Sequence, residues 1–142
     1  MYKLKQVLYT GVATSTGGRE GTAKSDDGNL SVKLSTPKTL GGAGGEGTNP
    51  EQMFAAGYAA CFIGALKNVA AGAKVKLGDD INVTGEVAIG PIEPGFGIAV
   101  KLTVDLGDVD RDTAQALVDK AHQVCPYSNA TRNNIEVEIA LA

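Results

Sequence analysis

The chain has 142 residues, the usual size of one domain, and its 43% apolar and 20% charged residues are ordinary values for a globular protein. This composition excludes a wholly disordered chain, which needs low hydrophobicity and a high net charge, and we expect a single domain over residues 1–142. The formal net charge of -3 excludes a strongly basic surface, so we expect no nucleic-acid partner.

The expected compartment follows from the N-terminus and the cysteine content. The first residues lack the apolar run and the cleavage pattern of a signal peptide. Two cysteines, Cys61 and Cys125, are too few for the disulfide scaffold of a small secreted protein. We therefore expect a cytoplasmic protein, in which a disulfide is typically transient, catalytic or redox-sensing.

The N-terminal segment, residues 1–35, is expected to form strands. The pairs Gly-Gly at 17–18 and Asp-Gly at 27–28 are turn signals, and Arg19 follows the first of them. Apolar and polar residues alternate over 30–34, which is the period of a half-buried strand.

A glycine-rich loop over residues 36–48 precedes the clearest helix start in the chain. Asn49 suits the N-cap and Pro50 suits the first helical position. Glu51 then lies in the first turn, where the helix dipole favours a carboxylate.

The next run, residues 53–66, contains no charge and is apolar or small on every side, which predicts a helix buried all round. Its 14 residues fall short of the roughly 20 that span a bilayer, so we expect no membrane partner. A single domain of this length has little material with which to cover a helix completely. We therefore expect a homodimer, in which a second subunit covers the remaining surface.

The C-terminal half alternates strands and helices. Period-two patterns predict strands over 81–89 and 98–104, separated by a turn at 90–95. A helical stripe predicts a helix over 110–124, and a last alternating run predicts a strand over 135–141. This order favours an α+β fold in which helices pack on antiparallel sheets.

Cys61 and Cys125 are the residues of greatest chemical interest. A lone cysteine in a helix is most often a small buried apolar residue, and burial disfavours the reactive thiolate. A nearby arginine is the cation best suited to hold a desolvated thiolate. Cys125 lies on the inward stripe of its helix, and Pro126 ends the helical geometry there. A buried cysteine and a second one at a hinge fit a peroxidatic and resolving pair, in which a sulfenic acid condenses to a disulfide.

Other interpretations use some of the same residues. His122, the only histidine, shares a helix face with Cys125, and Cys61 would complete a three-ligand zinc site, although an H-x-x-C spacing arises readily by chance. The glycines of residues 42–47 match G-x-G-x-x-G, but no strand directly precedes them and no βαβ pattern surrounds them. A non-catalytic module that binds hydrophobic ligands is a further alternative.

The longest motifs surround the two cysteines, and with the early turn they carry a family resemblance. The chain resembles the Ohr branch of the OsmC/Ohr family, the organic hydroperoxide resistance proteins. The resemblance covers essentially the whole chain in order. The matching stretches are residues 16–19, 34–37, 40–42, 48–52, 54–62 and 122–132.

This resemblance implies a thiol-dependent peroxidase that reduces organic hydroperoxides, including those of fatty acids. Cys61 is implied to be the peroxidatic cysteine and Cys125 the resolving one, while Arg19 stabilises the thiolate and positions the peroxide, and Glu51 holds Arg19. An intertwined homodimer with sites at the subunit interface is also implied. The disulfide would be reduced by a dihydrolipoyl-type dithiol borne on a lipoylated protein, and no metal, haem or flavin cofactor is expected.

The spacing within the long helix adds a constraint. Glu51 and Cys61 lie roughly 15 Å apart along a helix that rises 1.5 Å per residue. We therefore hypothesise that Arg19 and Glu51 of one chain serve Cys61 of the other. Met53, Phe54 and Phe62 flank the cysteine on the helix and are either core residues or an apolar lining that favours alkyl hydroperoxides over hydrogen peroxide.

Overall fold

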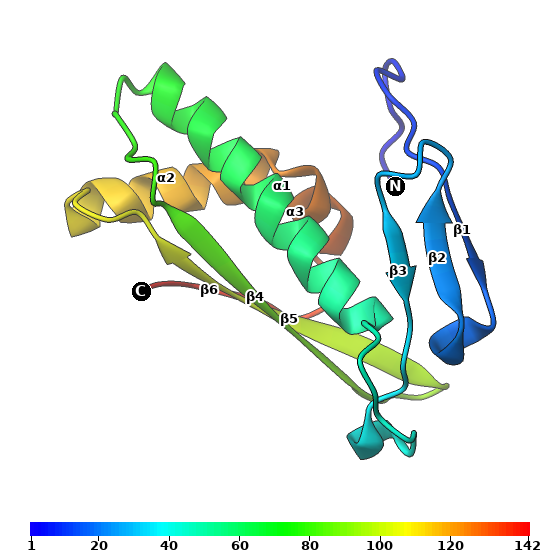
Figure 1. The fold of residues 1–142 in the computed structure, drawn as a ribbon. Helices are drawn as coiled ribbons and strands as arrows, with labels where there is room; N and C mark the ends of the chain where they lie inside the picture. Colours follow the sequence, from blue (N-terminus) through cyan, green and yellow to red (C-terminus); the bar gives the residue numbers. More distant parts are fainter. The chain divides into compact units, whose positions relative to one another are not determined.

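The computed structural model describes residues 1–142, which form two compact units, residues 1–50 and 51–142. Each unit has its own three-stranded sheet (Figure 1). Together they make an α+β fold, as predicted.

The first unit is an antiparallel sheet in the order β1-β2-β3, followed by a loop. Its strands are β1 (Ala13–Thr16), β2 (Thr22–Ser25) and β3 (Ser31–Lys33). Both predicted turns are present. Gly17 adopts a left-handed φ of 69° before the short 3-10 helix η1 (Gly18–Glu20), which carries Arg19. After a second 3-10 helix, η2 (Lys38–Leu40), the loop returns to pair Thr48 with Leu34.

The second unit places two helices on one sheet and adds a short third helix. Its elements are α1 (Pro50–Gly72), β4 (Asn82–Pro91), β5 (Phe96–Asp105), α2 (Arg111–Val124), α3 (Pro126–Thr131) and β6 (Val137–Leu141). The helix starts, the β4–β5 hairpin and the last strand agree with the sequence patterns. The strand order in this sheet is β4-β5-β6.

The sheet of this unit has one apolar and one polar face. On β5, Val100, Leu102 and Val104 are buried, whereas Lys101 between them is exposed and lies 3.8 Å from the Glu138 carboxylate of β6. Alternate side chains of a strand point to opposite faces, so the period-two pattern determined which face meets the helices.

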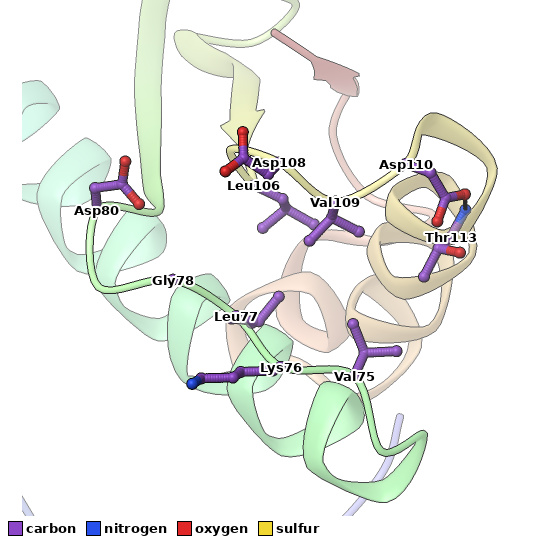
Figure 2. Close-up of a pocket in the computed structure, with 10 residues that line it drawn as sticks. All are labelled: Val75, Lys76, Leu77, Gly78, Asp80, Leu106, Asp108, Val109, Asp110 and Thr113. Atoms are coloured by element: carbon purple, nitrogen blue, oxygen red, sulfur yellow. Dashed lines mark hydrogen bonds between the residues drawn. The ribbon is translucent and has the colours of Figure 1, made fainter.

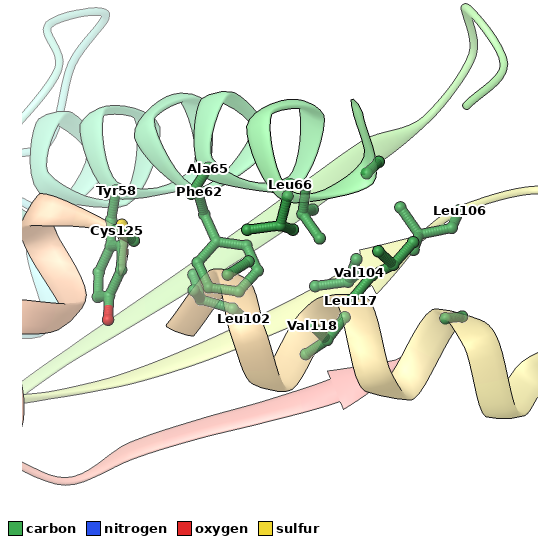
Figure 3. Close-up of a cluster of buried hydrophobic side chains, with 14 of the residues drawn as sticks. Tyr58, Phe62, Ala65, Leu66, Leu102, Val104, Leu106, Leu117, Val118 and Cys125 are labelled. Carbon is green, nitrogen blue, oxygen red and sulfur yellow. The ribbon is translucent and has the colours of Figure 1, made fainter. Parts of the chain in front are cut away.

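The core of the unit lies between α1, α2 and the apolar face of the sheet. Tyr58, Phe62 and Leu66 of α1 are fully buried, and Figure 3 shows them directed toward the side chains of β5 and α2. Leu117 and Val118 of α2 belong to the same cluster. Asp110 caps the start of α2, where its carboxylate accepts a hydrogen bond from the Thr113 N–H at 3.0 Å.

The single chain covers the first long helix on one side only, as expected for a domain with too little material to surround it, and its complete burial in a dimer remains a prediction. The sheet and α2 cover only one side of α1, and the opposite face, which includes Ala56, Ala60 and Gly64, is exposed. The helix is also longer than its uncharged run. By length and composition alone its 23 residues are enough to cross a membrane, but the core helix of a globular protein passes the same test, and its inner face is packed in the core.

Two further details differ from the sequence expectations. β6 pairs with β5 in parallel, because α2 and α3 together return the chain to the start of the sheet, whereas all the other strand pairs are antiparallel. The segment after Cys125, expected to be turn-rich, forms α3. Pro126 occupies the first position of this helix, where a missing N–H has no cost, and Cys125 has the extended backbone of an N-cap.

Candidate active site

The two cysteines meet in the second unit. Cys61 lies on α1 and is half-buried, and Cys125 is completely buried at the junction of α2 and α3. Both are free thiols, and the Cys125 thiol lies within hydrogen-bonding reach of the Cys61 sulfur. The fold therefore brings together two sulfur atoms that are far apart along the chain.

The surroundings of Cys61 favour its neutral form. Burial raises the pKa of the Cys61 thiol above its ordinary value, and the adjacent Cys125 raises this pKa further. The backbone N–H of Tyr127, at the start of α3, acts in the opposite direction by hydrogen bonding to the sulfur. A nearby cation would favour the thiolate, which is the reactive form of a cysteine.

Three aromatic rings from α1 and α3, the helices that flank the cysteines, pack together. The ring of Phe54 packs edge-on against Tyr58 at 6.2 Å and against Tyr127 at 6.0 Å between ring centroids. Gly57 allows Tyr127 to lie close to α1, because a Cβ at this position would stand 3.0 Å from the Tyr127 hydroxyl. Phe62 is a fully buried core residue, whereas Phe54 is half-buried.

A set of hydrogen-bonded polar side chains, some buried and some half-buried, lies at the same junction. The Tyr58 hydroxyl is 2.9 Å from Ser128 Oγ and 3.1 Å from Thr131 Oγ1, and His122 Nδ1 is 2.8 Å from Ser128 Oγ. Arg132 donates to the His122 carbonyl and, at 2.9 Å, to Asn129 Oδ1. Tyr58, Ser128 and Thr131 were not predicted from the sequence to be site residues. A tyrosine inside the uncharged run 53–66 was the available signal, because a buried hydroxyl needs a partner.

This arrangement bears on the zinc interpretation. His122 directs Nδ1 to a serine hydroxyl, and the structure contains no group of three or more His, Cys, Asp or Glu residues that could hold a metal ion. Burial and the Arg132 guanidinium lower the pKa of His122, with Asp119 acting in the opposite direction. His122 therefore takes part in side-chain hydrogen bonding within the protein.

Arg19 and Glu51 belong to different units. Arg19 is half-buried in η1, and its carbonyl accepts a hydrogen bond from Thr36 Oγ1 at 3.4 Å. Glu51 is half-buried in the first turn of α1. Their roles at Cys61 remain a prediction.

A pocket of about 480 Å³ lies at the other end of the second unit (Figure 2). Its lining contains the acidic residues Asp80, Asp108 and Asp110 and a single basic residue, Lys76. The pocket includes the segment after Gly72, the last residue of α1, which is about 16 Å along the helix from Cys61. It is therefore separate from the cysteine pair.

Comparison with known proteins places this site in a family. The profile of the family described as "OsmC-like protein" matches residues 42–140. The chain belongs to the OsmC-like protein family. The matched region contains both cysteines and the whole helical junction between them.

The similar members of the OsmC-like family are named for organic hydroperoxide resistance. The organic hydroperoxide resistance protein of Xanthomonas axonopodis pv. citri is 62% identical over 97% of both chains. The crystal structure of a Legionella pneumophila organic hydroperoxide resistance protein has 46% identity and a TM-score of 0.90, covering 96% of this chain and 99% of that one. The structure of OhrB of Bacillus subtilis has 46% identity and a TM-score of 0.87 over 96% and 100%. The predicted membership of the Ohr branch is confirmed.

Proposed function

We propose that this protein is a cysteine-based peroxidase that reduces organic hydroperoxides to alcohols in antioxidant defence. The meeting of two free thiols, one half-buried and one buried, is the observation that carries the proposal. The names of the similar proteins support the substrate class. No metal, haem or flavin is required, because the two thiols supply both electrons.

In the proposed reaction, the Cys61 thiolate attacks the terminal oxygen of the hydroperoxide. The O–O bond breaks, the alkoxide takes a proton and leaves as an alcohol, and Cys61 becomes a sulfenic acid. The Cys125 thiol then attacks the Cys61 sulfur, an S–S bond forms, and the sulfenic oxygen leaves as water. The buried position of Cys125 beside Cys61 supports this second step, because the resolving thiol does not have to diffuse to its target.

Arg19 is the proposed source of the cation that Cys61 needs. The raised pKa of Cys61 makes the thiolate scarce without one. A guanidinium stays charged when desolvated, and its planar fork can engage the thiolate, the peroxide and a carboxylate together. We assign that carboxylate to Glu51, which would hold Arg19 in the orientation required for reaction.

The aromatic cluster supports a preference for organic substrates. Phe54 and Tyr127 provide apolar surface beside Cys61 that an alkyl chain can cover. Burying apolar area contributes about 25 cal/mol per Å², and hydrogen peroxide has no such area to bury. We therefore expect alkyl and fatty-acid hydroperoxides to be preferred.

The proposed reductant is a dihydrolipoyl-type dithiol, borne on a lipoylated protein. Its first thiol would attack the disulfide, and its second would then close a ring and release the reduced pair. We expect the working protein to be a homodimer in the cytoplasm.

Thiol titration tests the proposed function. The reduced protein should lose two thiols per chain on addition of one equivalent of an alkyl hydroperoxide, more slowly with hydrogen peroxide, and a dithiol should restore both. Cys61→Ser should abolish peroxide consumption, because a serine hydroxyl is not ionised near neutral pH. Cys125→Ser should consume peroxide but accumulate overoxidised Cys61.

Two outcomes would contradict the proposal. Peroxide turnover by Cys61→Ser at the parent rate would exclude Cys61 as the nucleophile. Retention of both thiols in the parent, with hydrophobic ligand still bound, would indicate the alternative function of a non-catalytic binding module.

A further inference from the structure

A continuous hydrogen-bonded chain of side chains connects the helices that carry the two cysteines. It runs from His122 of α2 through Ser128 of α3 to Tyr58 of α1, and on to Thr131 of α3, with contacts of 2.8, 2.9 and 3.1 Å. Tyr58 and Ser128 have no exposed surface, and Thr131 is 6% exposed. A buried hydroxyl without a partner is costly, so these contacts act together to hold the three helices.

The geometry shows which atom donates the proton in each hydrogen bond of this side-chain network. Thr131 Oγ1 lies 2.9 Å from the Tyr127 carbonyl, which can only accept, so the single Thr131 hydroxyl proton is used there. The contact between Tyr58 and Thr131 then requires Tyr58 to donate, and the contact between Ser128 and Tyr58 requires Ser128 to donate. The proton between His122 and Ser128 must therefore come from Nδ1–H of His122.

Three members of the hydrogen-bonded chain are close in sequence to the cysteines. Tyr58 precedes Cys61 by three residues on α1, and residues three apart on a helix lie on one face. His122, in the last turn of α2, and Ser128, in the first turn of α3, each lie three residues from Cys125, which caps both helices.

Cys125 is the joint on which this arrangement depends. It is the last residue of the α2 cap and the first of the α3 cap, with an extended backbone between two helices. Because Cys125 and Tyr127 lie where the two helices meet, a change in the angle between α2 and α3 would move the Cys125 sulfur and the Tyr127 N–H relative to Cys61. Arg132 reinforces this angle from the end of α3 by donating to the His122 carbonyl.

We propose that Ser128 and Tyr58 are positioning residues. Through the chain His122 to Ser128 to Tyr58 to Thr131 they hold α3 so that the Cys125 thiol and the Tyr127 N–H remain at the Cys61 sulfur. This inference rests on the proposed function. It predicts a role in the resolving step, in which Cys125 must reach the Cys61 sulfenic acid before a second hydroperoxide converts that group to a sulfinic acid.

The test measures how oxidised Cys61 partitions between disulfide and sulfinic acid. Tyr58→Phe and Ser128→Ala each remove one oxygen, and mass spectrometry after a graded excess of cumene hydroperoxide gives the ratio of the two products. Because a hydrogen bond in a folded protein is typically worth about 0.5–1.5 kcal/mol, and 1.36 kcal/mol is a factor of ten, we expect the sulfinic fraction to rise about 2- to 13-fold relative to disulfide. Thr84→Val, which removes an exposed hydroxyl from β4, is the control and should partition like the parent.

The double variant distinguishes a shared chain from general destabilisation. If both residues act through the same hydrogen-bonded chain of side chains, the double variant Tyr58→Phe with Ser128→Ala should form no more sulfinic acid than the stronger single variant. Either single substitution already breaks that series of hydrogen bonds. Tyr58→Phe keeps the ring and its packing, so it decides the result if Ser128→Ala does not fold. Unchanged partitioning in Tyr58→Phe, or additive effects in the double variant, would overturn the proposal.

The single histidine gives an independent measurement. Nitrogen-15 NMR of the reduced parent should report the Nδ1–H tautomer at neutral pH, and Tyr58→Phe should alter that signal. An Nε2–H tautomer in the parent would overturn the ordered chain. Neither result depends on peroxide chemistry, so failure of this inference is distinguishable from failure of the proposed function, in which the parent would form no disulfide at all.

Discussion

At the scale of single residues, the environment of Cys61 disfavours its reactive thiolate form. Burial and a neighbouring thiol raise the pKa of Cys61, while one backbone N–H from Tyr127 opposes them. A single hydrogen bond does not outweigh the desolvation of a thiolate, and so the pair of cysteines by itself is poorly reactive. A nearby cation would oppose this shift, and this is the role proposed for Arg19.

His122 allows a pH-dependence to be predicted with a definite sign. Burial and Arg132 lower its pKa from the ordinary 6.5, so below that pH the unfolded chain takes up a proton that the folded protein does not. The free energy of unfolding should therefore fall as the pH is lowered through about 6.5 toward 5. Urea denaturation at several pH values measures this fall.

His122→Asn is the matched variant for that measurement, because it keeps an N–H donor and does not titrate. Since the chain has no other histidine, the variant should lose most of the decline in this pH range. Parallel curves for the parent and the variant would contradict the assignment. Asp27 and Asp110, whose pKa values are lowered from 3.8 by hydrogen bonds, affect stability only at more acidic pH.

At the scale of elements, apolar and polar side chains alternate along β5, and this alternation determines which face of the sheet packs against the helices. Leu102 has no exposed surface and pairs with Gly85 of β4 on the face that meets α1 and α2. A residue shifted by one position along either strand points to the opposite, polar face. The support for the cysteine-bearing helices therefore depends on a few apolar side chains of the sheet.

Leu102→Ala should lower the free energy of unfolding by about 2–5 kcal/mol, because it removes core contacts and leaves a cavity. Thr84→Val on the exposed face of β4 should change it by less than about 0.5 kcal/mol. Chemical denaturation of the two variants beside the parent gives both values. Equal effects would mean that the apolar face of the hairpin has been misassigned.

At the scale of the whole molecule, a single chain leaves much apolar surface uncovered. The first unit buries only three side chains below a tenth of their surface, those of Ala23, Leu34 and Ser35. Large exposed apolar residues occur in its first 12 residues, and α1 exposes its small-residue face. A second subunit that covers these surfaces is the expected arrangement, since contiguous apolar surface is typical of association sites.

Mixed variants can show which chain supplies Arg19. Arg19→Ala keeps Cys61, and Cys61→Ser keeps Arg19, so each alone should be inactive. If Arg19 serves the Cys61 of the other chain, refolding an equimolar mixture should restore about a quarter of the parent activity, because half of the symmetric dimers would contain one complete site of two. No recovery, in a mixture shown by sedimentation to be dimeric, would place Arg19 and Cys61 in the same chain.

The amino-acid sequence by itself determined the local structure and the family. Periodicity located β3, the strands of the second unit and α2, and turn signals indicated strands before β3. The Asn-Pro-Glu signal located the start of α1, and the motifs around Cys61 and Cys125 identified the OsmC-like family. These features are local, because they depend on the spacing of neighbouring residues and on caps.

Only the tertiary structure decided how distant groups meet. The approach of Cys125 to Cys61, the parallel pairing of β6 and the chain through Tyr58, Ser128 and His122 join segments far apart in the sequence. Which face of α1 the single chain leaves exposed was likewise decided only by the packing of the sheet and α2. Local patterns carry no information on such contacts, because the contacts depend on how helices and sheet pack around a shared core.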